Sequence, residues 1–464
     1  MYLRRRSIVA ERQKMILGLF MRQGGHHEGG WRHPTSHSDA GFTLDRYRSY
    51  AAMAEAAAIH FVFVADSAGV RESTLASMSR SARVDGFEPL TLMAALSVTT
   101  DRIGLVATAS TTFNEPYHIA RKFASIDHLS GGRAGWNIVT STNPFEAENF
   151  NLQELPLHEE RYARAEEFVS TAKGLWDSFA DDAFIRNRDR GLYLDPARIN
   201  VLDHRGEYFK VRGPLNISRC PQGYPVLAQA GSSQPGARLA ARHGELVFTA
   251  QQTIEDAKRF YDLVKGQAVE FGRSRDALAI LPGIVPIVAK TDEAAEAKLA
   301  QLQSLIHEDL ALELARRLLG YVIDLDKHGL DERIPDDLIE TNNMKSRQKL
   351  LMDTARARNY TIRQLAALLS VGRGHLVAVG SPARVVDQMQ EYFEQKAADG
   401  FVVMPAMFPS GLEDFVHLVI PELRRRDLFR TQYCGKTLRE NLGFSRPPNI
   451  HFSAGERSDG LLHH

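Results

Sequence analysis

The sequence predicts an α/β protein whose core is a (β/α)8 TIM barrel with insertions. Eight short apolar runs recur along the chain, and segments with helical periodicity lie between them. This alternation is typical of parallel strands that are joined by helices. The length of 464 residues suits one large barrel with insertions. We therefore expect a single barrel domain over residues 1–464.

The expected strands are continuous apolar runs rather than alternating ones, so both of their faces should be buried. They lie at 15–21, 61–66, 103–110, 135–141, 225–231, 246–250, 278–288 and 401–405. The expected helices lie at 44–58, 89–99, 118–129, 161–179, 235–243, 253–271, 292–319 and 382–398. Eight such units favour a sheet that closes into a barrel over an open sheet.

Three longer segments interrupt this alternation. Residues 24–41 are rich in Gly, His and Ser, and residues 181–218 are polar and aromatic, with a small strand pair expected over the barrel. Residues 319–380 hold charged stretches, a helix-like stretch at 361–369 and a turn at 372–374. Loops of this length in a compact domain are usually lids or binding loops. We expect a lid within 319–380 and a flexible tail at 453–464.

Composition indicates an ordinary globular protein without a charge signal for a polyanionic partner. The apolar fraction is 44% and the charged fraction 25%, and 57 Lys and Arg balance 57 Asp and Glu. This balance gives no electrostatic reason to expect nucleic acid or an anionic membrane as a partner. The first apolar run is too short to span a bilayer. Cys220 and Cys434 are expected to be reduced thiols in a cytoplasmic protein.

Polar side chains follow several expected strands, at the end of a barrel where chemistry is found. Asp66 ends the second strand, Asn137 lies in the fourth, and Ser232 and Ser233 follow the fifth. Asp66 and the serines have a plain alternative role as helix N-caps. For the serines this role is compatible with anion binding, because both use the same free N–H groups. A buried Asn137 needs partners, which the polar edge of a ligand would provide.

The chain lacks the motifs of several enzyme classes. It has no Gly-x-Ser-x-Gly elbow, no Gly-x-x-x-x-Gly-Lys-Ser/Thr loop and no Rossmann glycine fingerprint after a strand. The pair His26-His27 has no carboxylate or cysteine at ligand spacing, so no metal site is expected there. Without a nicotinamide motif, a redox enzyme with this sequence would receive its electrons on a cofactor that is reduced elsewhere.

One long motif and several short ones carry a family resemblance. The long motif runs over 103–141, as IGLVATASTTFNEPYH and then ARKFASIDHLSGGRAGWNIVTS. The short ones include Trp-Arg-His-Pro at 31–34, Ala-Asp-Ser at 65–67, His-Glu-Glu-Arg-Tyr at 158–162, Gln-Ala-Gly at 229–231 and Phe-Thr-Ala-Gln-Gln at 248–252. From about Met15 to Pro448 the chain resembles the bacterial-luciferase-like two-component flavin monooxygenases. The group concerned holds the large components of nitrilotriacetate monooxygenase, dibenzothiophene-sulfone monooxygenase and pristinamycin synthase.

This resemblance implies a flavin site at the strand ends. It places Asp66, Thr108 and Asn137 by the flavin ring. It places His158 and Tyr162 at the ribityl chain and phosphate of FMN. Ser233, Ser141 and Arg161 are implied around the phosphate. A dianionic phosphate suits a helix N-terminus with hydroxyl donors. His26 or His27 would steer protonation near the flavin, because histidine titrates near neutral pH.

The resemblance also implies the reaction. The protein would be an oxygenase component that takes reduced FMN (FMNH2) from a separate NAD(P)H:flavin reductase. It would use O2 to oxygenate a small organic molecule, such as an amino-polycarboxylate, an organosulfur compound or a related xenobiotic, as a homodimer or homotetramer. The alternatives are a deazaflavin-dependent oxidoreductase of the same superfamily and a non-catalytic flavin-binding barrel. The basic residues available for a polyanionic substrate are Arg22, Arg32, Arg71, Arg80 and Arg83.

Overall fold

The computed structural model describes residues 14–37, 39, 42–319, 328, 331–334, 341–342 and 345–452, so the tail expected at 453–464 lies outside it. Its nine-stranded sheet contains a closed, all-parallel barrel in which the last strand pairs with the first. The barrel strands are β1 (Ile16–Phe20), β2 (Phe61–Val64), β3 (Gly104–Ser110), β4 (Ala134–Val139), β7 (Val226–Gln229), β8 (Leu246–Thr249), β9 (Ala279–Val288) and β11 (Gly400–Val403). Each overlaps the run predicted for it, and the (β/α)8 TIM barrel is confirmed.

The strands are buried on both faces, as their continuous apolar sequences predict. In β2, Phe61 and Phe63 belong to one apolar cluster and Val62 and Val64 to another. Successive side chains of a strand point to opposite faces, so the two clusters fill the barrel and the layer between barrel and helices. The core therefore lies on both sides of the barrel wall.

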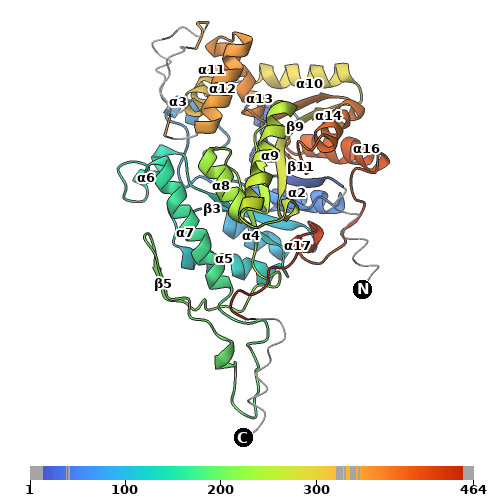
Figure 1. Ribbon diagram of the computed structural model, residues 1–464. Coiled ribbons are helices and arrows are strands. Elements are labelled where there is room, and N and C mark those ends of the chain that lie inside the picture. Colours follow the sequence, from blue (N-terminus) through green and yellow to red (C-terminus); the bar gives the residue numbers. More distant parts are fainter. Residues whose placement is uncertain are drawn as a thin grey trace.

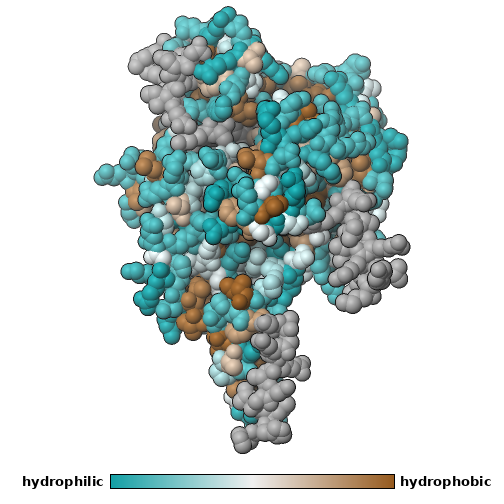
Figure 2. Space-filling view, viewed as in Figure 1, coloured by the Kyte–Doolittle hydropathy of each residue, from teal (hydrophilic) through white to brown (hydrophobic). Residues whose placement is uncertain are grey.

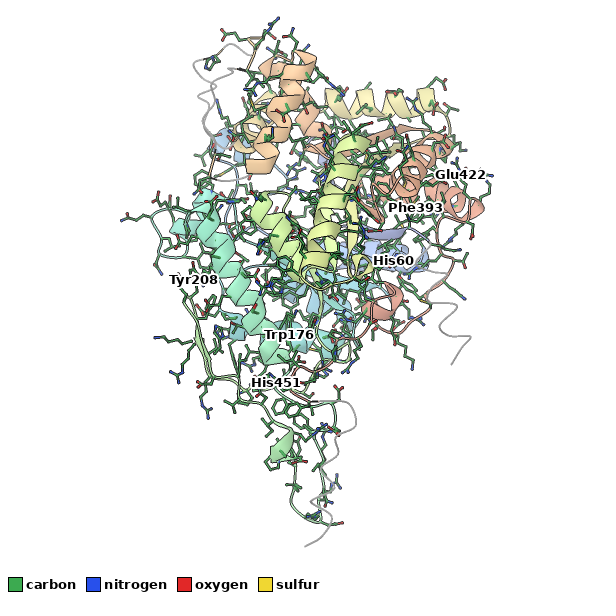
Figure 3. All side chains as sticks on the ribbon, viewed as in Figure 1. His60, Trp176, Tyr208, Phe393, Glu422 and His451 are labelled. Carbon is green, nitrogen blue, oxygen red and sulfur yellow. The ribbon has the colours of Figure 1, made fainter. Side chains whose placement is uncertain are left out.

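Several helices around the barrel begin at residues whose side chains cap them. Thr43, Ser233 and Thr253 each accept a hydrogen bond from the backbone N–H three residues further on. The covering helices are α2 (Leu44–Ala56), α4 (Pro89–Ser97), α5 (Pro116–Leu129), α7 (His158–Trp176), α8 (Gln234–His243), α9 (Ile254–Glu270), α10 (Asp292–Ser304) and α14 (Pro382–Glu394) (Figure 1). Trp176, labelled in Figure 3, ends α7 and donates from its indole to the Ala120 carbonyl oxygen at 2.8 Å.

Two elements differ from the prediction. The strand β10 (Leu376–Gly380) was not expected. It pairs in parallel with the C-terminal half of the long strand β9 and adds a ninth strand outside the barrel. The helix expected at 292–319 is two helices, α10 and α11 (Glu308–Leu318). The break coincides with a long-range contact, because the Arg32 guanidinium donates to the Leu305 carbonyl oxygen at 2.6 Å.

The described part of segment 319–380 is mainly helical. It holds α12 (Lys345–Arg358) and α13 (Ile362–Gly372), and the latter covers the expected stretch at 361–369. A capping box at Thr361 starts α13, and Arg373, with a φ of 52°, ends it at the expected turn. Leu314, Leu351 and Leu365 lie in one apolar cluster that joins α11, α12 and α13. These helices lie together at one end of the barrel (Figure 1).

The segment 181–218 contains the expected strand pair, but not over the barrel. Strands β5 (His204–Arg205) and β6 (Lys210–Val211) pair antiparallel. Glu167 on α7 accepts hydrogen bonds from the backbone N–H groups of Tyr208 and Phe209 at 3.0 and 2.9 Å, which fixes the pair to the flank of that helix (Figure 3). The segment follows the C-terminal end of α7, so it lies toward the other end of the barrel from α11–α13 (Figure 1).

Short helices complete the described chain. They are α3 (Leu75–Met78), α6 (Pro144–Glu148), α15 (Ser410–Asp414), α16 (Ile420–Arg425) and α17 (Leu438–Asn441), with a π-helical turn at Phe415–Val419 between α15 and α16. The surface is largely hydrophilic on the face drawn in Figure 2. Across the described residues, no helix combines the length and the apolar character needed to cross a membrane.

Candidate active site

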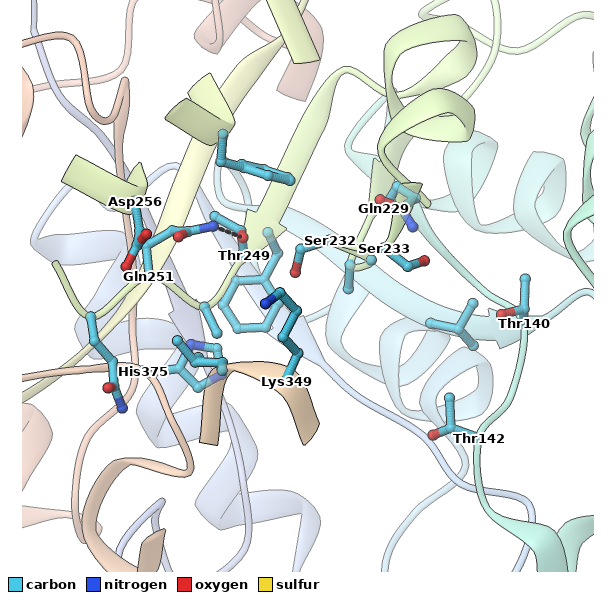
Figure 4. A pocket seen from close by; sticks show the side chains of 18 of the residues that line it. Thr140, Thr142, Gln229, Ser232, Ser233, Thr249, Gln251, Asp256, Lys349 and His375 are labelled. Atoms are coloured by element: carbon cyan, nitrogen blue, oxygen red, sulfur yellow. Dashed lines mark hydrogen bonds between the residues drawn. The ribbon is translucent and has the colours of Figure 1, made fainter. Parts of the chain in front are cut away.

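A cavity of about 990 Å³ opens at the C-terminal ends of the barrel strands. The residues that follow β4, β7 and β8 line it, together with the first turns of α7, α8 and α9 and one face of α12 (Figure 4). Of the predicted site residues, those that line it are Asp66, Ser141, His158, Tyr162 and Ser233. Segments far apart in the sequence therefore meet at one mouth, as expected of a barrel.

The start of α8 forms one wall of this cavity. Ser233 caps the helix, since its hydroxyl accepts a hydrogen bond from the Gly236 N–H at 3.3 Å, and Ser232 lies beside it on the wall (Figure 4). A Cβ built on Gly231 would lie 2.7 Å from the Tyr162 hydroxyl and 2.5 Å from Gln229 Nε2. The loop thus approaches its neighbours as only glycine allows. Hydroxyls and N–H groups at a helix N-terminus are suited to a phosphate.

Two buried amide side chains in the barrel have unused acceptors. Asn137 donates to the Thr108 hydroxyl at 2.9 Å, and that hydroxyl donates to the Val64 carbonyl oxygen at 2.8 Å. The Oδ1 atom of Asn137 and the Oε1 atom of Gln229 are buried and accept no hydrogen bond from the described residues. A buried acceptor without a partner is costly. These two oxygens therefore favour a ligand with N–H or O–H donors.

The opposite wall is aromatic and is covered by α12. The Phe248 ring stacks on the His375 ring, with centroids 5.0 Å apart and an interplanar angle of 13°. Gln251 donates to the Thr249 hydroxyl at 3.0 Å, the bond drawn in Figure 4. On α12, Thr354 donates to the Gln252 side chain at 3.3 Å, which ties this helix to the loop after β8. A flat aromatic ligand would find both apolar and polar contacts here.

Asp66 lies at the edge of the cavity and is not a helix N-cap. Thr74 caps α3 and Glu88 caps α4, so the capping alternative for Asp66 is wrong. Burial raises the pKa of the Asp66 carboxyl from 3.8 to about 6. Arg71 donates to the backbone carbonyl oxygen of Asp66 at 2.7 Å. The carboxyl therefore changes its charge close to neutral pH.

The shifted pKa of Asp66 predicts a pH-dependent effect of Asp66→Asn on stability. The folded-state pKa of about 6 exceeds the ordinary value of 3.8, so the folded protein holds this proton more tightly than the unfolded chain. The carboxyl therefore costs stability above pH 6, and this cost fades as the pH falls toward 3.8. We expect Asp66→Asn to raise the unfolding midpoint most at pH 8 and by a smaller amount at pH 5, because the cost disappears only as the pH falls below 3.8. A difference that is the same at both pH values would contradict this.

Thr108, Asn137 and Arg161, which the resemblance placed at the flavin, do not line this cavity, whereas Ser141 does. Thr108 and Asn137 lie deeper in the barrel. The Arg161 guanidinium donates to the Pro156 carbonyl oxygen and, at 2.8 Å, to that of Asn342, so it fastens a loop rather than facing the cavity. Ser141 lies on the wall, with its hydroxyl 2.8 Å from that of Ser110.

His26 and His27 are buried beside the site rather than on its wall. Burial lowers the pKa of His27 to about 4 and that of His26 well below its usual value, so both rings are neutral near pH 7. The prediction that these histidines titrate near neutral pH is therefore wrong, because burial lowers both pKa values. The His27 Nδ1 atom accepts a hydrogen bond from the Gly29 N–H at 3.0 Å. The His26 ring packs edge-on against the Phe20 ring, with centroids 4.4 Å apart.

The site also contains residues that were not among the predicted site residues, although Gln229, Thr249 and Gln251 lie within the motifs at 229–231 and 248–252. They are Gln229, Thr249, Gln251 and His375, together with Lys349, Leu350, Asp353 and Thr354 of α12. Gln229 could have been predicted, because it lies near the end of a predicted strand, as Asp66 does. The residues of α12 had no such signal, since they lie more than a hundred residues from the strand ends that they cover.

Comparison with known proteins identifies the family. The family model for luciferase-like monooxygenase matches residues 23–399. N-acetyl-S-(2-succino)cysteine monooxygenase of Bacillus subtilis (strain 168) is 47% identical, over 95% of this chain and 99% of its own. Nitrilotriacetate monooxygenase component A of Aminobacter aminovorans is 45% identical, over 94% and 98%. A riboflavin lyase solved with modified FMN and riboflavin superimposes with a TM-score of 0.84 at 31% identity, over 93% and 96% of the two chains. This chain belongs to the luciferase-like monooxygenase family, and it is a monooxygenase.

Proposed function

We propose that this protein is the oxygenase component of a two-component system that uses FMNH2 and O2 to oxygenate a small organic molecule. The observation that carries the proposal is the cavity itself. It combines a hydroxyl-rich helix N-terminus for a phosphate with the buried, unpaired Gln229 acceptor and an aromatic wall for a flat ring, and the second unpaired acceptor, of Asn137, lies on the neighbouring strand β4. The solved riboflavin lyase, which is similar over 93% of this chain, holds a modified FMN.

The residues present fit FMN. The start of α8, with Ser232, Ser233 and the Tyr162 hydroxyl, would bind the phosphate. The orphaned oxygens of Asn137 and Gln229 would accept hydrogen bonds from the N–H groups of the ring. This matches the roles that the resemblance implies for Asn137, Tyr162 and Ser233, and it adds Gln229.

Bound reduced flavin would supply the two electrons of the reaction; one atom of O2 enters the substrate and the other leaves as water. The protein orients the reactants, excludes water and manages protons. Asp66, whose pKa is about 6, can hold or release a proton at its carboxyl near neutral pH. His26 and His27, both neutral near pH 7, would be the further candidates to pass a proton.

The proposal also covers the partner protein, the cellular compartment and the oligomeric state. We propose that a separate NAD(P)H:flavin reductase supplies the reduced FMN, because the sequence has no nicotinamide motif of its own. We also propose that the enzyme works in the cytoplasm as a homodimer or homotetramer. The similarity to named monooxygenases does not favour the deazaflavin-dependent oxidoreductase or the non-catalytic barrel.

One experiment separates these possibilities. The protein is titrated with reduced FMN without oxygen, and the bound complex is then mixed with isotopically labelled O2 and a panel of candidate substrates. The proposed function predicts saturable binding of reduced FMN and one labelled oxygen atom in the product. A deazaflavin-dependent enzyme would give no label, and a non-catalytic barrel would bind flavin without forming product. Failure to bind reduced FMN would refute the proposal.

The helix α12 is expected to act as the lid of the site. Leu350 and Thr354 line the cavity from this helix, so the helix covers part of the cavity. We expect Leu350→Ala to raise the fraction of O2 that is released as hydrogen peroxide, because water then reaches the reaction more easily. Arg356→Ala, an exposed change on the same helix but off the cavity wall, is the control. The peroxide yield per reduced FMN measures the effect, and equal yields from the two variants would count against a lid.

A further inference from the structure

A second cavity, of about 340 Å³, lies beside the first and carries several arginines on its wall. Asp66 and Arg71 line both cavities, so the two spaces have a common wall. The other arginines on the wall of the second cavity are Arg22, Arg83 and Arg317. Its apolar lining comes from residues near the ends of β1 and β2 and from the loop before α4, namely Phe20, Met21, Val64, Val70, Val84 and Phe87.

Arg22 is the unusual member of this group. It lies two residues beyond the end of β1, and among the described residues its guanidinium makes no hydrogen bond or ion pair; its Nε atom is fully buried without an acceptor. Burial, together with the neighbouring cations Arg373 and Arg71, lowers the pKa of Arg22 well below its usual value. An unpaired cation in such surroundings is strongly unfavourable. The position therefore favours an anion that is not part of the described chain.

Two nearby carboxylates, those of Glu28 and Glu72, interact with residues other than Arg22. Glu28, the anion that acts on Arg22, forms ion pairs with Arg83 and with Arg373. The Oε1 atom of Glu72 accepts a hydrogen bond from Ser81 at 2.7 Å and lies 3.9 Å from Arg317, while its Oε2 atom is buried without a partner among the described residues.

The two other acidic residues on the wall do not pair with Arg22 either. Asp66 lies where the two cavities meet, and Asp85 is exposed at the rim. Neither forms an ion pair with Arg22 in the part of the chain that the structure describes. The guanidinium of Arg22 thus faces a cavity without a counter-ion from the described residues.

We propose that Arg22, with Arg71 and Arg317 on the same wall, binds a carboxylate of the substrate, so that the substrate is a small organic acid. This inference rests on the proposed function, because it names the substrate class of that site. A guanidinium binds a carboxylate through two parallel hydrogen bonds. The apolar wall covers the carbon skeleton, and the shared wall at Asp66 and Arg71 directs the other end of the molecule toward the flavin cavity.

The test measures binding without flavin. Nitrilotriacetate and N-acetyl-S-(2-succino)cysteine are the acidic probes, dibenzothiophene sulfone is the uncharged one, and calorimetry gives each affinity. We expect Arg22→Met to weaken binding of the acids by about tenfold to a hundredfold, since one charge-assisted contact is lost. Arg22→Lys should keep part of the affinity. Arg80→Met removes an exposed arginine outside the cavity wall, and as the matched control it should bind the acids like the wild type.

Three outcomes would overturn the proposal: neither acid binds to the wild type, Arg22→Met binds an acid as tightly as Arg80→Met does, or only the sulfone binds. Titration of each variant with reduced FMN keeps the two proposals separate. A protein that binds reduced FMN but no acid refutes the organic-acid site alone, whereas a protein that binds acids but no reduced FMN refutes the proposed cofactor. Retained binding of reduced FMN also shows that a variant is folded.

Discussion

Gly231→Val is expected to weaken the binding of reduced FMN by about tenfold to a hundredfold, the range that overpacking a closely fitted site produces. A Cβ at this position would lie 2.5 Å from Gln229 Nε2 and 2.7 Å from the Tyr162 hydroxyl. Both side chains would have to move, and both line the proposed flavin cavity. The substitution therefore displaces one acceptor for the ring and one donor for the phosphate at the same time.

The matched control for this prediction is Gly266→Val. Gly266 lies in α9, and a Cβ built there meets nothing within 4 Å. Fluorescence titration with reduced FMN under anaerobic conditions gives the affinity of each variant. Gly266→Val should bind like the wild type, with at most a small gain of helix stability, because valine is a better helix former than glycine. Equal affinities for the two variants would mean that the loop before α8 does not hold the cofactor.

The barrel could be predicted from the sequence because its signal is local. A run such as 278–288 is apolar throughout, and only a strand buried on both faces requires this. The break between α10 and α11 could not be predicted, because it coincides with a bond between Arg32 and Leu305, far apart in the sequence. The same holds for the pair β5–β6, which Glu167 on α7 attaches to the flank of the barrel.

The part of the candidate site that could be predicted from the sequence is the part where secondary structure alone fixes the directions of the side chains. His158 and Tyr162 are four residues apart on α7, so they share one face, and their ring centroids lie 4.9 Å apart. Arg161 is offset from Tyr162 by about 100° around the helix, and it turns to the Pro156 and Asn342 carbonyls instead. The burial that keeps His26 and His27 neutral depends on the whole fold, and no pattern in the sequence reveals it.

A buried ion pair joins the C-terminal part of the chain to the barrel. Arg439 of α17 makes two hydrogen bonds to the Glu245 carboxylate, one of them 3.0 Å long, and both side chains are largely buried. Glu245 also accepts a hydrogen bond from the Leu227 N–H at 3.0 Å, and Arg439 donates to the Tyr224 carbonyl oxygen at 3.2 Å. The carboxylate thus neutralises a buried cation and fixes the start of a barrel strand.

Glu245→Ala is expected to lower the free energy of unfolding by about 3–5 kcal/mol, the cost of leaving one partner of a buried pair without its counter-charge. Asp262→Ala is the control, because Asp262 pairs with Arg275 at 2.8 Å with both side chains well exposed. That change should cost no more than about 1 kcal/mol. Urea unfolding followed by circular dichroism measures both variants against the wild type.

The double variant Glu245→Ala/Arg439→Ala distinguishes the loss of stability caused by the unpaired charge from the loss caused by poorer packing. If the unpaired Arg439 cation causes the loss, removal of its side chain should relieve part of it, so the double variant should be more stable than the sum of the two single losses predicts. Strictly additive losses would place the effect in packing and in the lost bond to Leu227. A loss for Glu245→Ala no greater than that for Asp262→Ala would mean that the barrel does not depend on this pair to hold α17.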